Sequence, residues 1–139
     1  MKEQISTESW PVVVIQMESE VSVESMQLLL DSWESWLDRK EPFGMLFRFE
    51  GTENNHSGEI KKMRKAWIKA HRGQVRQTMA GVAMVVKSSA ILNLLKPIAD
   101  TVARQMFGCK AKVFGWESDR QAMEWLQSQI EATGNQRPV

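Results

Sequence analysis

The sequence predicts one α/β domain with a mainly parallel sheet of four or five strands covered by helices. Four strand-like runs alternate with amphipathic stretches along almost the whole chain. The length of 139 residues suits a single core, and no internal repeat divides the chain. We expect the domain at residues 10–132. Residues 1–9 are expected as a flexible segment or an extra edge strand, and residues 133–139 as a flexible tail.

Residues 10–17 predict the first strand, because consecutive β-branched side chains suit a sheet that is covered on both faces. Ser22 can cap the helix that follows, whose apolar residues recur at spacings of three and four. The predicted buried stripe of this helix is Val23, Met26, Leu30, Trp33 and Leu37. Residues 38–42 end the helix, since Pro42 pushes the preceding residue out of the helical region.

Residues 43–50 alternate in polarity, so one face of this second predicted strand is expected to be partly exposed. A helix is then expected from Glu59 to about Arg76, and Gly73 marks a point where it ends or loosens. The predicted core side of this helix is Ile60, Met63, Trp67 and either Ala70 or His71.

Residues 80–87 form an apolar run without alternation, which predicts a central strand covered on both faces. Ser88 or Ser89 can cap the next helix. Pro97 breaks this helix because proline lacks the backbone donor and clashes with the preceding turn. The two expected pieces are residues 90–95 and residues 97–107.

Gly108 is expected to stop the broken helix, and residues 110–114 predict the last strand. Ser118 and Gln121 then form a capping box for the final helix. Residues 134–138 contain helix breakers and are expected to end that helix. Its predicted buried stripe is Ala122, either Trp125 or Leu126, and Ile130.

Composition limits the classes of protein. The chain is 42% hydrophobic and 25% charged, which is ordinary for a globular domain. Its single cysteine, Cys109, excludes an internal disulfide framework, and no leader opens the sequence. The longest apolar stretches are too short for a transmembrane segment. We therefore expect a cytoplasmic protein.

Charge is distributed unevenly along the chain. Residues 1–59 carry a net charge of −8 and residues 60–139 a net charge of +9. A basic helix contains Lys61, Lys62, Arg64, Lys65, Lys69, Arg72 and Arg76. It could attract phosphate groups, or it could be a solvated face paired with acidic residues of the first helix. Nucleic acid is not the expected partner, because no zinc motif, helix-turn-helix or aromatic-flanked basic strand accompanies the charge.

The loop before the basic helix contains the candidate site. Ser57 can cap the helix, and a phosphate there would lie beside the positive helix end and nearby lysines. The predicted phosphorylation or anion site is Ser57, Gly58, Lys61 and Lys62. No metal site is predicted, because His56 and His71 lack partners at ligand spacing, and no cofactor motif occurs.

These features resemble the SpoIIAA-like group of STAS-type domains, named for the sporulation anti-sigma-factor antagonist. The similarity covers residues 10–130 and rests on residues 10–14, the basic helix through His71 to residues 82–86, and the closing Val113-Phe114 with residues 122–126. The resemblance implies a domain that contacts another protein or a small ligand without chemistry of its own. Regulatory members carry a phosphorylatable serine in an Asp-Ser-Ser-Gly-like turn. Here residues 55–58 read Asn-His-Ser-Gly and retain only the Ser-Gly pair.

Our first functional hypothesis is a non-enzymatic regulatory domain that binds a protein partner or a second copy of itself. Two tryptophans three residues apart on one helix are not both expected to point into the sheet, which favours an exposed apolar face. The predicted interface residues are Trp33, Trp36, Met63 and Trp67.

An alternative hypothesis is a carrier of a small apolar ligand, a lipid or a nucleotide. The broken helix around Pro97 could leave an apolar cavity beneath it, with lysines at the cavity mouth. An enzyme using Glu50, His56 and Ser57 is disfavoured, because it would need a base within hydrogen-bond reach of the serine and a separate oxyanion site.

Overall fold

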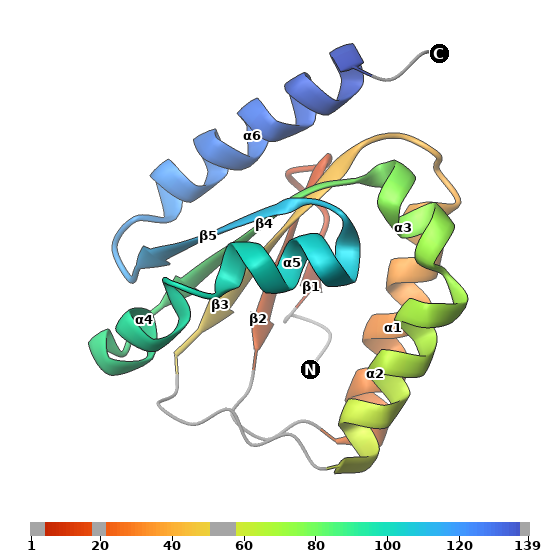
Figure 1. The fold of residues 1–139 in the computed structure, drawn as a ribbon, viewed down its shortest axis with the longest axis horizontal. Coiled ribbons are helices and arrows are strands. Elements are labelled where there is room, and N and C mark those ends of the chain that lie inside the picture. Colours follow the sequence, from red (N-terminus) through yellow and green to blue (C-terminus); the bar gives the residue numbers. More distant parts are fainter. Residues whose placement is uncertain (1–4, 18–21, 51–57, 137–139) are drawn as a thin grey trace.

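A five-stranded sheet forms the centre of the molecule. The computed structural model describes residues 5–17, 22–50 and 58–136 (Figure 1). The strands follow their order in the sequence: β1 (Ile5–Ser6), β2 (Val12–Met17), β3 (Phe43–Phe49), β4 (Met79–Val86) and β5 (Lys110–Gly115). β2 to β5 are parallel, and β1 pairs antiparallel with β2. The predicted α/β class and mainly parallel sheet are confirmed.

The helices cover the two faces of the sheet unequally. They are α1 (Val23–Leu37), α2 (Gly58–Ala70), α3 (Arg72–Thr78), α4 (Ser89–Leu95), α5 (Ala99–Phe107) and α6 (Asp119–Gln136). Parallel strands that advance in one direction place right-handed crossover helices on the same face. Accordingly, α1 to α5 lie on one side of the sheet and α6 lies on the other (Figure 1).

Alternate residues of β3 belong to two separate cores. Phe43 and Met45 are fully buried in the larger core, beneath α1, α2 and α5. Leu46 is buried in the smaller core, beneath α6. At Gly44 a Cβ atom would lie 2.9 Å from Leu126 Cδ2, so the absence of a side chain there lets α6 approach the sheet closely.

The boundaries of α1 agree with the sequence prediction. The hydroxyl of Ser22 accepts a hydrogen bond from the Ser25 N–H at 3.0 Å and caps the helix, which ends at Leu37. Within the predicted stripe Val23 is wrong, because its side chain is 42% exposed. Leu29 and Trp36 are buried instead. The buried stripe is wider than predicted because α1 contacts α2 as well as the sheet.

Both tryptophans of α1 are interior residues. Trp33 is 2% exposed, with its ring centroid 4.7 Å from that of Trp67 and 5.6 Å from that of Phe107. Trp36 is 4% exposed and packs edge-on against Phe43. The expectation that these two tryptophans contribute to an exposed apolar face is wrong, because α2 and α5 extend the core beyond the sheet.

The long basic helix is two helices that meet at His71. Gly73, the predicted break, lies inside α3. His71 Nδ1 lies 2.8 Å from the Trp67 carbonyl oxygen, and its ring stacks on the Trp67 indole. On the inner side of α2, Ile60 is buried as predicted, and Ile68 is buried although it was not predicted.

The helix break at Pro97 is confirmed. α4 ends at Leu95, and α5 begins at Ala99, two residues later than predicted. The Ser88 hydroxyl accepts a hydrogen bond from the Ile91 N–H and caps α4. Gly108 ends α5 in the left-handed conformation, with φ of 72°.

The final helix buries the predicted face. Ala122, Leu126 and Ile130 are buried, whereas Trp125 is only half-buried. α6 continues through Gly134 and ends at Gln136, within the segment of residues 134–138 that was predicted to end it. A glycine inside a helix costs about 1 kcal/mol relative to alanine, which is too little to stop a helix by itself.

Candidate functional site

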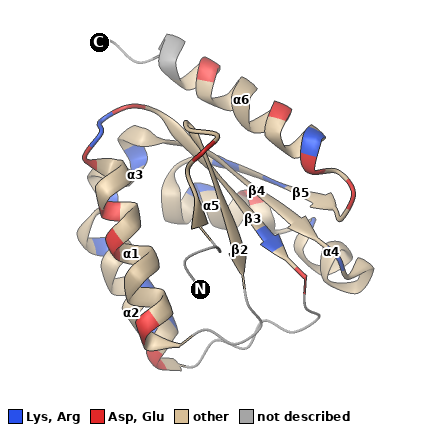
Figure 2. Cartoon of the chain, turned by 180° about the vertical axis from the view of Figure 1, so that it is seen from behind, with Lys and Arg blue, Asp and Glu red and all other residues tan. Residues whose placement is uncertain are grey.

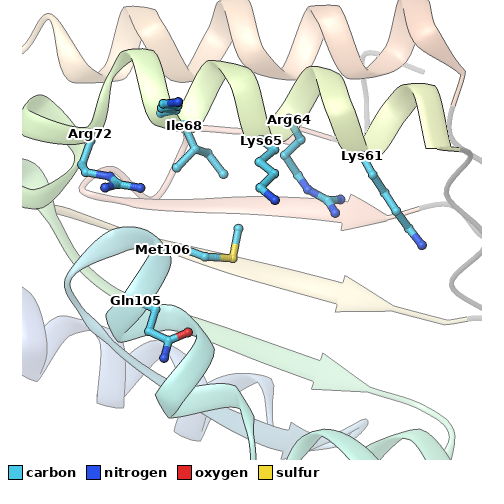
Figure 3. A pocket seen from close by; sticks show the side chains of 8 residues that line it. Lys61, Arg64, Lys65, Ile68, Arg72, Gln105 and Met106 are labelled. Atoms are coloured by element: carbon cyan, nitrogen blue, oxygen red, sulfur yellow. The ribbon is translucent and has the colours of Figure 1, made fainter.

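A cleft of about 440 Å³ opens between α2 and α5. Figure 3 shows Lys61, Arg64 and Lys65 projecting from α2 toward this space, and Met106 reaching into it from α5. The lining residues are Lys61, Arg64, Lys65, Ile68, Lys69, Arg72, Gln105 and Met106. We call this space the cationic cleft.

The helical period gathers positive charge on one side of α2. Lys61, Lys65 and Lys69 follow one another at intervals of four residues, so they lie on one face. Arg64 and Arg72 complete a set of five cationic residues among the eight that line the cleft, and none of the eight is acidic. Burial lowers the pKa of the Arg64 guanidinium, but an arginine stays protonated under ordinary conditions.

The cleft lysines are not paired with the acidic residues of α1 in the described part of the chain. Figure 2 shows acidic positions recurring along α1, next to α2. Glu34 Oε1 of α1 lies 3.7 Å from His71 Nε2 in the basic segment. No described carboxylate forms an ion pair with Lys61, Lys65 or Lys69. The interpretation that this face is paired with α1 therefore fails for the cleft lysines.

The residues predicted for the anion site are only partly brought together. Lys61 lines the cleft, whereas Lys62 points to another side of α2 and does not. Gly58 is the exposed first residue of α2, and Ser57 lies outside the described residues. The four-residue spacing of the lysines could have identified the α2 wall, but no local signal identifies Gln105 and Met106 of α5.

A second, smaller pocket of about 180 Å³ lies under the break between α4 and α5. It is lined by Val82, Met84, Leu95, Ile98, Ala99, Val102, Ala103 and Phe107. We call it the apolar pocket. The carrier hypothesis placed an apolar cavity here with lysines at its mouth. The described lining residues are all apolar, and no lysine is among them.

A separate charged cluster lies on the α6 side of the sheet. The Arg48 guanidinium lies 4.3 Å from the ring centroid of Trp116 and its Nε lies 3.0 Å from Asp119 Oδ2. Because Asp119 begins α6, this ion pair ties the helix to β3. The positive charge of Arg48 is compensated within the protein, unlike that of the cleft lysines.

The described part of the chain contains no cluster of metal-ligating side chains. No three His, Cys, Asp or Glu side chains there come together in a way that could hold a metal ion. Cys109 is buried, at 7% exposure. No helix in the described ranges has both the length and the apolar character needed to cross a membrane.

The sheet, the one-sided crossovers and the lone covering helix define an α/β domain of the STAS type. The family model described as SpoIIAA-like matches residues 12–127. The chain therefore belongs to the SpoIIAA-like family, as the sequence resemblance predicted. No curated protein and no solved structure matches the chain.

Proposed function

We propose that this chain is a non-enzymatic regulatory domain whose cationic cleft binds a small anionic ligand. One observation carries the proposal: among the described residues, five cationic side chains and no acidic one line a single cleft, in a chain whose net charge is only +1. A like-charge cluster of this kind raises the local concentration of anions and lowers the energy of a bound negative group.

The size and lining of the cleft favour a small ligand. Its volume of about 440 Å³ falls in the range typical of small-molecule sites. Arg72 can offer two parallel N–H donors to a carboxylate or phosphate, and the Gln105 amide can donate or accept. These groups bind and orient an anion. A reaction would further need a nucleophile with a base beside it, and the described lining residues include no histidine or carboxylate that could act as that base.

Regulation would follow from the position of the cleft between two helices. A ligand held by α2 on one side and α5 on the other would link elements that belong to successive crossovers. The surface that α2 and α5 present to a protein partner would then differ between the empty and the occupied domain. Such a difference in contacts is what allows a ligand to shift the affinity for a partner.

Neutralising the cleft lysines tests the proposal. We expect the triple variant Lys61→Gln, Lys65→Gln, Lys69→Gln to bind inorganic pyrophosphate about tenfold or more weakly than the wild type, measured by isothermal titration calorimetry at low ionic strength. The matched control is Lys62→Gln, Lys110→Gln, Lys112→Gln, which removes three exposed lysines that do not line the cleft. Equal weakening in both variants, or no pyrophosphate binding by the wild type, would refute the proposal.

Self-association is a second candidate function, favoured by a different surface from the predicted one. Trp33 and Trp36 are interior, which removes half of the predicted interface. Three apolar side chains around the α4–α5 break are instead exposed: Leu94 at 67%, Ile98 at 48% and Val102 at 42%. Ile98 and Val102 lie four residues apart at the start of α5, and Leu94 precedes the break on α4. We call these three residues the α4–α5 face, and two copies could cover it for each other.

A further inference from the structure

We infer that the ligand is an amphiphilic anion, with its charged head in the cationic cleft and a single apolar chain along α5 toward the apolar pocket. This inference rests on the proposed function and adds the chemical class of the ligand. A carboxylate or a phosphate head would satisfy the same cations, so the shared chemistry is an anionic head on an apolar chain.

The first supporting observation is an incompletely covered part of the sheet. On the face beneath α1, α2 and α5, the side chains of the amino-terminal halves of the strands are fully buried, as Val13 and Met45 show. Toward the carboxyl ends, Met17, Phe47 and Phe49 of the same face are only half-buried. The carboxyl ends of parallel strands are where ligands of open α/β sheets bind.

The second observation connects the cationic cleft to the apolar pocket. Met106 lines the cleft and Val102 lines the pocket, and the two residues lie four apart on one face of α5. Met84 of β4 lies at the floor of the pocket and is half-buried. The charged lining residues therefore lie on α2 and at the start of α3, while Met106 and Val102 continue an apolar surface along α5.

This division of chemistry fits an amphiphile better than a simple anion. Inorganic phosphate would use the cations and leave the apolar surface in water. An attached hydrocarbon chain would cover that surface, and each buried methylene adds to the affinity through the hydrophobic effect. A neutral hydrocarbon ligand, conversely, would leave the cationic side chains of the cleft without a counter-charge.

A matched pair of ligands tests the inference. Methyl phosphate and dodecyl phosphate have the same head, and dodecyl maltoside has the same chain without charge. With the wild-type chain and all ligands below their micelle-forming concentrations, calorimetry should show dodecyl phosphate binding at least about tenfold more tightly than methyl phosphate, a difference that a few buried methylenes can supply. Dodecyl maltoside should bind more weakly than dodecyl phosphate.

Substitutions along α5 test where the hydrocarbon chain of the ligand binds. Val102→Gln, at a 42% exposed position that lines the apolar pocket and not the cationic cleft, should weaken dodecyl phosphate at least about fivefold and leave methyl phosphate unchanged, because it adds polarity where the hydrocarbon chain is expected. Met106→Gln, at a half-buried position, is a second variant that is expected to weaken dodecyl phosphate. Met123→Gln is the control, since Met123 is also half-buried but packs against the opposite core.

The outcomes separate the inference from the proposed function. If pyrophosphate and methyl phosphate bind but dodecyl phosphate binds no more tightly than methyl phosphate, the inference of an amphiphilic ligand is refuted. The proposed anion site is then retained. If dodecyl maltoside binds as tightly as dodecyl phosphate, or if Met123→Gln weakens binding as much as Met106→Gln, the assigned binding mode is also refuted. If no anion binds, both proposals fail.

Discussion

Asp100 joins two elements through one carboxylate. Its Oδ2 accepts a hydrogen bond from Arg104 Nε at 2.7 Å, and its Oδ1 accepts one from the Ala111 N–H at 3.1 Å. The first of these partners belongs to α5 and the second to β5. The hydrogen bond from Arg104, followed by that from Ala111, lowers the pKa of the Asp100 carboxyl. A residue near the start of a helix thus also fixes the strand that follows it.

Replacing this carboxylate should reduce stability in a pH-dependent way. We expect Asp100→Ala to lower the free energy of unfolding by up to about 1 kcal/mol at neutral pH, given two hydrogen bonds on a partly exposed side chain. Because the native pKa lies below the unfolded value, the stabilisation is complete above about pH 4 and is lost as the pH falls through the native pKa. Urea unfolding from pH 7 to pH 3 measures it.

Glu124→Ala serves as the comparison for Asp100→Ala. Glu124 forms an ion pair with Arg120 within α6, and both side chains are mostly exposed. Removing such a pair should change stability little. A loss in Asp100→Ala that stays constant down to pH 3 would contradict the role assigned to the ionised carboxylate.

Single residues were predictable from the sequence where they act on their own backbone. Ser22, Ser88, Pro97 and Gly108 bound helices as predicted, because caps and breakers depend on a few neighbouring residues. The burial of Trp36 was not predictable in this way. It depends on contacts with elements that are distant in the sequence.

At the scale of elements, the end of α5 depends on a glycine for two reasons. Gly108 has φ of 72°, and a Cβ atom there would lie 2.9 Å from Arg76 Cγ. The Arg76 side chain in turn donates a hydrogen bond to the Gln105 carbonyl oxygen at 3.3 Å, so it lies across the end of the helix. A side chain at position 108 would be strained and would also displace Arg76.

Two alanine substitutions of glycines should therefore have opposite effects. Gly108→Ala should lower the free energy of unfolding by about 1–2 kcal/mol, from the left-handed conformation alone. Gly73→Ala should raise it by up to about 1 kcal/mol, because Gly73 lies within α3 with nothing within 4 Å of its added Cβ. Urea denaturation of both variants measures the difference. Stabilisation by both would show that Gly108 is not constrained.

One of the two walls of the cationic cleft could be predicted from the sequence. The α2 wall follows from a charge pattern of helical period, which is a local property. The α5 wall does not, since Gln105 and Met106 carry no distinctive pattern and meet α2 only through the crossover geometry. The break at His71 was missed for a similar reason. Gly73 is the weaker helix former, but the contacts of the His71 ring with Trp67 coincide with the break.

At the scale of the whole molecule, hydrophobic periodicity was enough to predict the class of fold. Helical and strand periods alternate so regularly that one sheet with crossover helices was the expected solution. The order of the strands was not predicted, because patterns within each strand do not specify its neighbour. The structure has the simplest order, in which each parallel strand pairs with the next one in the sequence.

Self-association through the α4–α5 face is tested at this scale. We expect the wild-type chain, at roughly 100 μM, to show about twice the mass of the 15.9 kDa chain in light scattering, since exposed apolar side chains are covered in a dimer. Leu94→Asp should yield a monomer. Leu28→Asp, at a 48% exposed position on α1, should leave the dimer intact. A monomeric wild type would remove this candidate.

The placement of α6 alone on its face has a consequence for synthesis. As the chain leaves the ribosome, β2 to β5 can pair and acquire α1 to α5 while the opposite surface, with Val12, Leu46 and Ala83, still faces water. That surface becomes covered only when the helix after β5 emerges. Until then the nascent domain exposes an apolar face of its sheet, which gives chaperones a defined interval in which to bind it.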